Sequence, residues 1–494
     1  MLKAIDKWLV PYLRSALRRP RKVEGPIHIL FAVCDHFEPL SPHGAKPHAV
    51  GIKRVQRWLN EYPKLAEQFR DADGVAPQHT FFYPEEEYHP DFVGPLADLT
   101  AAGLGEVEIH LHHRNDTPEG LREKLTRFRD LLREEHGLLG SYSYSGRNRT
   151  CSPGIEDRGA GQRSELPDAG RLEGSAPTAD EGRGGGGNVQ CSMLNAQRST
   201  GNTEHRTPNT EHVGTGPVPP TYGFIHGNWA LCNSRPDGDW CGVNEELSIL
   251  AETGCYADFT FPSVPSPTQP RTVNSIYYAT DAPGKPRGHD RGAEAQIVAG
   301  TGPVPLRTKD GALGNGTIGL RDKKTANHEP GTTNPEQRTP NPEPKTPNTA
   351  NRSCSRHNPL LLVQGPLALN WRWRKWGVLP RVEHSDLCGS NPPTPLRADL
   401  WGRQHIHVRG KPDWVFIKLH THGCIESNTD VLLGEPMRTL HAYLTTQYND
   451  GTDYCLHYVT AREMANLIHA AEAGTAAPPG DCRNFIYAPP PVRQ

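Results

Sequence analysis

Three histidines lie within four positions of one short segment, VEIHLHHRND at residues 107–116. His110, His112 and His113 follow two apolar residues that flank an acidic one. Neutral imidazole groups are common zinc ligands, and they also transfer protons in hydrolytic reactions. The segment therefore indicates a metal site and leaves open which of the three histidines bind the metal.

Four other apolar runs also lead directly into polar residues that can bind metals or transfer protons. The polar and aromatic residues that follow these runs are Asp35, His36 and Glu38; His226, Asn228 and Trp229; Asp258; and His420 and His422. One such run would mean little, because a buried histidine with satisfied hydrogen bonds is more common than a metal ligand. Five runs of this kind in one chain favour a metal-dependent site.

Short apolar runs alternate with segments of helical spacing through most of the chain. Strands are predicted at residues 26–34, 79–84, 106–113, 222–227, 255–263, 360–365 and 413–423, and helices at 53–72, 92–103, 119–137, 243–254 and 395–404. This alternation predicts an α/β fold with a parallel sheet, and the number of units predicts a (β/α) barrel. In such a barrel the catalytic residues lie at the carboxyl ends of the strands, where the polar residues above are found.

Two long low-complexity segments, residues 141–216 and 297–357, interrupt this pattern. They are too poor in apolar residues to offset the entropy of ordering, so both are predicted to be disordered. They share the word GTGPVP, at 214–219 and 300–305, but lack the fixed period of a structural repeat. Insertions into surface loops of an older domain explain them best, and functional binding tails are the alternative.

The remaining segments, 26–140, 217–296 and 358–480, are predicted to form one discontinuous barrel domain. A basic helix at residues 1–25 would precede it, and a flexible tail at 481–494 would follow it. The N-terminal helix is expected to be solvated, with contact to a membrane surface as the alternative.

The composition excludes several classes of protein. The chain has 54 Lys and Arg against 56 Asp and Glu, which gives no electrostatic case for nucleic acid as a partner. Its eleven cysteines include no C-x-x-C pair, so neither a zinc ribbon nor a disulfide framework is indicated, and a reducing, cytoplasmic location is expected. No apolar run approaches the ~20 residues of a membrane helix, so no integral membrane segment is expected. The N-terminal apolar run stops at Pro11, which argues against a signal peptide.

The order and content of the strand ends resemble the polysaccharide deacetylase family, the NodB-type carbohydrate esterases, whose fold is a distorted (β/α)7-type barrel. That family has an Asp–Asp pair after the first strand, a His-Ser/Thr-x-x-His motif after a later strand, and a Leu-x-His motif near the end. Here CDHFEP (34–39), HLHH (110–113) and KLHTHG (418–423) occupy the corresponding places. The resemblance covers all three predicted barrel segments, although each motif is short.

The resemblance implies a metal-dependent hydrolase that removes acyl groups from amide- or ester-linked substrates, expected to be sugars. It implies that Asp35 is the base, His420 the catalytic acid, and Asp258 an acid that orients the base or the substrate. His36, His110 and His113 would bind a divalent metal, with zinc expected. The expected substrate-binding residues are Glu38, His112, His226, Asn228, Trp229 and His422.

The sequence also departs from the family pattern. His36 stands where the family has its second aspartate, so the third ligand is open between His36, Asp35 and Glu38. Leu111 replaces the Ser or Thr of the ligand motif, and no standard arginine motif is present. Side chains alternate along a strand, so His113 can join His110 at a metal only if the strand ends near Leu111 and the chain turns.

Three other functions fit parts of the pattern. An amidohydrolase has an H-x-H pair like His110 and His112, and a glycoside hydrolase would use two carboxylates. The third is a barrel that binds carbohydrate without catalysis.

Trp371, Trp373 and Trp376 form either a sugar-stacking or anion-binding lip, or a loop that packs its aromatic rings on the barrel. The substrate is expected to be a small molecule or a glycan, and the oligomeric state is left open.

Overall fold

The computed structural model describes residues 3–42, 44–142, 220–298 and 359–491. All of these belong to one unit of the chain, and the rest of this section concerns that unit. The two segments predicted to be disordered lie outside the described residues, except for 141–142 and 297–298.

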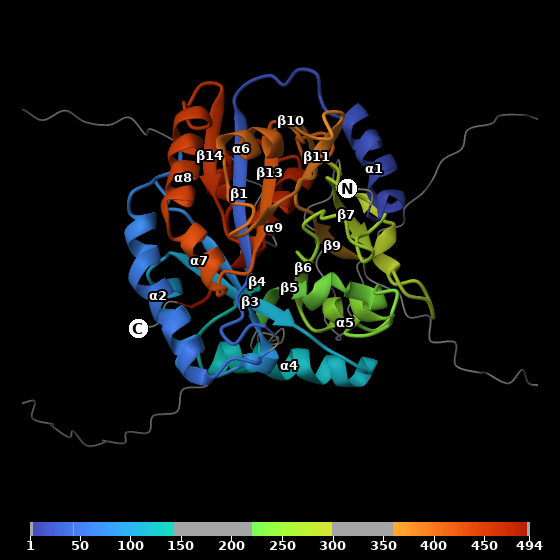
Figure 1. Ribbon diagram of the computed structural model, residues 1–494, viewed down its shortest axis with the longest axis vertical. Helices are drawn as coiled ribbons and strands as arrows, with labels where there is room; N and C mark the ends of the chain where they lie inside the picture. The colour runs from blue at the N-terminus through green and yellow to red at the C-terminus, as the bar shows by residue number, and fades with distance from the viewer. Residues whose placement is uncertain (1–2, 43, 143–219, 299–358, 492–494) are drawn as a thin grey trace, which may run out of the picture. The chain divides into compact units, whose positions relative to one another are not determined.

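Thirteen strands of the described residues form one mostly parallel sheet, as expected for an α/β protein (Figure 1). Its main order is β12-β13-β1-β2-β3-β5-β6-β9-β7-β8, and β14 also pairs with β1. The parallel pairs join β1 (Ile27–His36), β2 (His79–Pro84), β3 (Gly105–Leu111), β5 (Pro220–His226), β6 (Cys255–Asp258), β9 (Leu360–Val363), β12 (Asp386–Leu387), β13 (Trp414–Thr421) and β14 (Tyr454–Tyr458). Antiparallel pairs add β4 (Gly140–Tyr142), β7 (Ile276–Ala279), β8 (Ala293–Glu294) and β15 (Tyr487–Ala488).

The register of the parallel strands brings their carboxyl ends to one edge. Cys34 of β1 lies opposite His420 of β13, and His110 of β3 lies opposite Pro84 of β2. On the other side of β3, Leu111 lies opposite His226 of β5. The histidines predicted to end their strands are therefore neighbours in space.

The two faces of β1 are buried in different cores, and this decides where its last residues point. Phe31 and Val33 belong to a core shared with α2, whereas Ala32 and Cys34 belong to one shared with α9. Side chains alternate along a strand, so Asp35 continues the first face and His36 the second.

Nine α-helices are described around the sheet. They are α1 (Ile5–Leu17), α2 (His48–Ala66), α3 (Pro90–Ala101), α4 (Pro118–Glu134), α5 (Glu246–Glu252), α6 (Pro395–Gly402), α7 (Glu426–Leu432), α8 (Glu435–Gln447) and α9 (Ala461–Glu472). Helix α4 begins where the sequence predicts: Thr117 caps it by accepting a hydrogen bond from the Gly120 amide, with Pro118 in the first turn. No helix of the described ranges is long and apolar enough to cross a bilayer.

Both chain ends differ from their predictions. Helix α1 was expected to be solvated, but Trp8 and Tyr12 are buried against Val273 and Leu367. The tail from 481 was expected to be flexible, but Tyr487 is buried and pairs with Tyr142 of β4. In both cases a few large side chains bury enough apolar surface to fix a segment that has no long apolar pattern.

The tryptophan-rich segment forms a two-stranded hairpin, β10 (Ala368–Lys375) and β11 (Leu379–Glu383). Trp371, Trp373 and Trp376 are exposed, with 56%, 59% and 76% of their surface accessible. The interpretation that these rings pack on the barrel is therefore wrong.

Candidate metal centre

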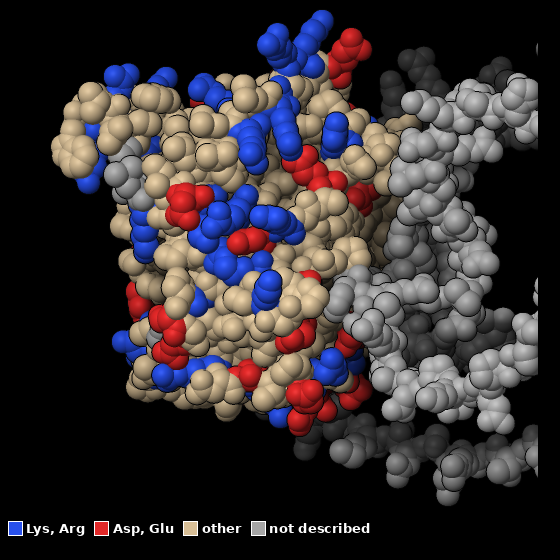
Figure 2. Space-filling model, turned by 90° about the vertical axis from the view of Figure 1, so that its right-hand side faces the viewer, with Lys and Arg blue, Asp and Glu red and all other residues tan. Residues whose placement is uncertain are grey.

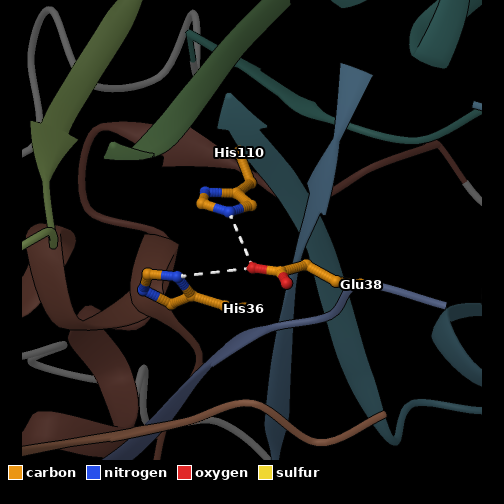
Figure 3. A group of neighbouring side chains, drawn as sticks. All are labelled: His36, Glu38 and His110. Carbon is orange, nitrogen blue, oxygen red and sulfur yellow. Dashed lines mark hydrogen bonds and ion pairs between the residues drawn. The ribbon is translucent and has the colours of Figure 1, made fainter. Parts of the chain in front are cut away.

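The carboxylate of Glu38, two residues beyond the end of β1, is buried among four imidazole rings. Its Oε1 atom lies 3.2 Å from Nε2 of His110 and 3.6 Å from Nε2 of His112. Nδ1 of His36 and Nε2 of His422 each lie 4.0 Å away (Figure 3 shows His36, Glu38 and His110). A tetrahedral zinc site with bonds of about 2.0–2.1 Å separates its ligand atoms by roughly 3.3 Å. The residues His36, Glu38, His110, His112 and His422 are hereafter called the Glu38 group. Within it, the ligand atoms of His36, Glu38 and His110 all lie within 4.8 Å of one another, close enough to share one metal ion.

The hydrogen bonds of His110 show which of its nitrogens carries the proton. Nδ1 lies 2.8 Å from the Ile225 carbonyl, which can only accept a hydrogen bond, so Nδ1 is the donor. In the neutral ring Nε2 then presents a lone pair to the Glu38 carboxylate. Two facing lone pairs repel each other unless a cation lies between them. A backbone carbonyl that orients a ligand histidine in this way is a common feature of metal sites.

His36 and His420 are buried without hydrogen-bond partners on either ring nitrogen among the described residues. Their ring centroids are 4.4 Å apart. Burial, together with the neighbouring imidazoles, lowers the pKa of both rings well below the ordinary value for histidine. Buried polar groups without partners are rare in native proteins and call for an explanation, and neutral imidazoles are suitable metal ligands or proton acceptors.

Glu38 is ionised despite its burial. Burial raises the pKa of this carboxyl, but its contacts with His110, His422 and His112 lower the pKa by more and bring it to about 2. Burial also lowers the pKa of His36 and His110, so the group offers a carboxylate and two imidazoles that favour the neutral form, a donor set that suits Zn²⁺.

His113 does not join His110, although β3 ends at Leu111 as that prediction required. It lies in a second buried group with His226 and Glu246. The Oε1 atom of Glu246 is 3.2 Å from Nε2 of His113 and 3.5 Å from Nε2 of His226. Two hydrogen bonds, to Asp116 and Glu246, outweigh burial and raise the pKa of His113 to about 9.

Asp35 lies outside both groups, contrary to the predicted role as the base. Its carboxylate accepts a hydrogen bond from the Gly423 amide at 2.6 Å and lies 2.9 Å from Nε2 of His79. The reason is the length of β1, which continues through His36 and so turns Asp35 toward the core that contains Trp58. Both carboxylate oxygens have partners, and the geometry gives Asp35 a structural role.

Asp258 supports the backbone of the second group and touches neither group directly. It accepts hydrogen bonds from the amide and hydroxyl of Thr260, whose hydroxyl oxygen in turn accepts one from the His226 amide. Burial raises the pKa of Asp258 to about 7. These hydrogen bonds position the end of β5, and the predicted role of Asp258 as an acid that orients the base or the substrate stays a prediction.

The loop after β5 holds Asn228 and Trp229 in left-handed backbone conformations, with φ of 55° and 52°. Such conformations are costly for residues other than glycine and cluster at functional sites. The Trp229 ring lies 5.5 Å from that of His420, and Nδ2 of Asn228 is buried without a hydrogen-bond partner among the described residues. Trp229 therefore lies beside His420, and the substrate-binding role expected for Asn228 and Trp229 stays a prediction.

The face that carries α1 and β7 has a gathering of Lys and Arg side chains near its centre (Figures 1 and 2). A cavity of about 880 Å³ lies between these elements. The arginines that line it are Arg14, Arg18, Arg19, Arg271, Arg291 and Arg409. Asp290 and Glu294 also line the cavity, and none of its lining residues belongs to the two histidine groups, so it is separate from both.

Glu246 is the residue of these groups that the sequence did not single out. It begins the short helix α5, and its place in the helical pattern carries no chemical signal.

The comparisons add no family: no protein-family model, curated protein or solved structure matches the chain.

Proposed function

We propose that this chain is a metal-dependent hydrolase of the polysaccharide deacetylase type, which removes acyl groups from an amide- or ester-linked sugar or related small molecule. The observation that carries the proposal is the Glu38 carboxylate with four imidazole nitrogens within 3.2–4.0 Å of one oxygen. Proteins rarely bury such an arrangement without a cation.

His36, Glu38 and His110 would hold the ion, and Zn²⁺ is the metal that best fits their donor atoms. When bound, such an ion acts as a Lewis acid toward a carbonyl oxygen and lowers the pKa of water. His110 is oriented for this role by the Ile225 carbonyl, and His112 by Glu86, whose Oε1 atom lies 2.5 Å from its Nδ1. His422 is partly exposed, so a substrate could reach it.

His420 is the best-placed proton-transfer residue. Its ring is buried beside His36, and Nε2 lies 3.8 Å from a carboxylate oxygen of Asp386. A neutral imidazole next to a carboxylate can accept a proton from the attacking water and pass it to the leaving group. We assign both steps to His420, since Asp35 is bound to His79 and Gly423.

A closed, barrel-like arrangement of the sheet is part of the proposal. The ammonium group of Lys418 on β13 donates to the carbonyl of Phe261 at 3.2 Å, just after β6. The Ser385 hydroxyl donates to the Pro262 carbonyl at 2.9 Å. Strands β13 and β6 stand five places apart in the sheet order, so these contacts support a curled sheet whose two sides approach each other.

The test is metal content together with product analysis. Purified wild-type protein should contain zinc and release acetate from N-acetylated glycan oligomers, and His110→Ala should lose both the metal of the Glu38 group and the activity. His407→Ala, which changes a partly exposed histidine outside the group, is the matched control and should retain both. Reducing sugar ends without acetate would indicate a glycoside hydrolase, and wild-type protein without metal would refute the proposal.

A further inference from the structure

We propose that His113, His226 and Glu246 form a second metal site, separate from the Glu38 group, which holds one divalent ion of the Zn²⁺ class in a structural role. The inference does not require the chain to be a hydrolase, because it concerns what fixes the loop after β5.

The three donor atoms have the spacing of a metal site and are sealed from solvent. Oε1 of Glu246 lies 3.2 Å from Nε2 of His113 and 3.5 Å from Nε2 of His226, close to the roughly 3.3 Å between ligand atoms of tetrahedral zinc. All three side chains are completely buried. The two imidazole rings lie 4.6 Å apart, tilted by 39°.

His226 provides the independent evidence for a cation. Its Nδ1 atom lies 2.5 Å from the Gly227 carbonyl, so the proton of the neutral ring is on Nδ1. Its Nε2 atom is buried, has no hydrogen-bond partner among the described residues, and faces the Glu246 carboxylate. A lone pair directed at a buried carboxylate is unfavourable in the bare protein and favourable when both bind one cation.

Neighbouring groups also fix the positions of the ligand side chains. Asp116 lies 3.0 Å from Nδ1 of His113, the arrangement of carboxylate, histidine and metal that is frequent in zinc proteins. The second oxygen of Glu246 accepts a hydrogen bond from the Cys232 amide at 2.6 Å. Gly242 passes so close to Glu246 that an added Cβ atom would overlap this same oxygen. The ligands are therefore fixed in place before any ion binds.

An ion-pair network without metal accounts for only part of this geometry. A protonated His113 between Asp116 and Glu246 would satisfy its own ring. It would leave Nε2 of His226 unpaired at 3.5 Å from the same carboxylate oxygen. A metal ion satisfies both rings at once.

The site would fix the loop that faces His420. This loop runs from His226 to Glu246, so one ion would tie its two ends to each other and to the end of β3 through His113. Within the loop, Asn228, Trp229, Cys232 and Asn233 all have positive φ. Such strain persists only where surrounding contacts hold the backbone in place. A single buried ion that binds residues at both ends of the loop would supply such contacts.

The first test uses wild-type protein alone. After removal of metal with a chelator, the protein should take up two Zn²⁺ ions, one at the Glu38 group and one at the second site. Hydrogen exchange of the peptide 227–245 should be fast in the chelated protein and slow after Zn²⁺ is restored. If metal removal leaves the exchange of this peptide unchanged, the inference is wrong.

The second test separates the two sites by substitution. Glu246→Gln should bind one equivalent of Zn²⁺ less than wild type and retain the ion of the Glu38 group. His110→Ala should lose only the ion of the Glu38 group. Glu252→Gln, an exposed glutamate on the same helix α5, should keep both. If Glu246→Gln does not fold, His226→Gln replaces it. If His110→Ala loses metal but Glu246→Gln binds as much metal as wild type, the second site is overturned and the proposed function is unaffected.

Discussion

The imidazole ring of His112 lies directly against the backbone of Gly227, where an added Cβ atom would come within 2.0 Å of the ring. His112 faces Glu38, and Gly227 follows His226 of the second group. The two histidine groups therefore meet at this contact, and only glycine leaves room for the ring.

Gly227→Ala should displace His112 and lower the stability of the protein. Overpacking of this kind costs about 1–3 kcal/mol, and the metal of the Glu38 group should bind more weakly. Thermal unfolding and zinc competition measure the two effects. Gly94→Ala is the control, because nothing lies within 4 Å of its Cβ position in α3, and it should stabilise the helix by about 0.5–1 kcal/mol. Equal unfolding temperatures for the two variants would contradict the close contact.

Asp35→Asn distinguishes the base predicted from the sequence from the structural role that the geometry gives this residue. The substitution removes a charged acceptor shared by His79 and the Gly423 amide, and should cost about 1–3 kcal/mol of stability. At saturating substrate, kcat should fall by no more than a few fold. A fall of roughly 10²–10⁴ in kcat, with the protein still folded, would restore Asp35 as the base.

His420→Gln should lower kcat by roughly 10²–10⁴ without loss of metal, because it removes the proton-transfer group and keeps the Glu38 group intact. Asp386→Asn should have a smaller effect, since Asp386 acts through His420 at 3.8 Å. Metal analysis accompanies both kinetic measurements. Loss of zinc from His420→Gln would show that His420 is a ligand and would remove its assigned role.

Asp116→Asn tests whether the Asp116 carboxylate orients His113 as a metal ligand. Loss of a carboxylate that orients a ligand histidine weakens metal binding by roughly 10–100-fold. The ion of the second site should therefore exchange faster, while the ion of the Glu38 group is retained. The measurement is zinc release to a chromogenic chelator in the variant and in wild type. Identical release curves would argue against a metal at His113.

The sequence was sufficient to predict that His36, His110 and His420 are close together. Each follows an apolar run, and carboxyl ends of parallel strands share one edge of a sheet. The strand at 79–84 was also predicted to the residue. These features depend on local periodicity, which is visible in a single sequence.

The direction in which an individual side chain points could not be predicted in this way. The first strand was predicted to end at Cys34, yet it continues to His36, and this difference of two residues removes Asp35 from the site. Glu246 meets His113 across more than a hundred residues of chain, and nothing in its helix marks it as a ligand. Strand ends and long-range partners are set by tertiary packing, which a local pattern does not contain.

His441, on α8 and away from both histidine groups, should make the protein less stable in mild acid. Its ring is buried against Phe69, with Nδ1 3.0 Å from the Tyr458 hydroxyl. Burial, together with the charge of His79, lowers the pKa of His441 to about 3, below the value of about 6.5 in the unfolded chain. Between these two values the unfolded state binds more protons, so the contribution is complete above about pH 6.5 and is lost as the pH falls toward 3.

Between pH 7 and pH 5 this single group should account for about 2 kcal/mol of lost unfolding free energy. Urea unfolding of His441→Asn at the two pH values should therefore show a smaller difference than wild type, by about that amount. His407→Asn, in which a partly exposed imidazole is removed, should behave as wild type. A pH difference in His441→Asn equal to that of wild type would mean that the ring is protonated in the folded protein and is not buried in its neutral form.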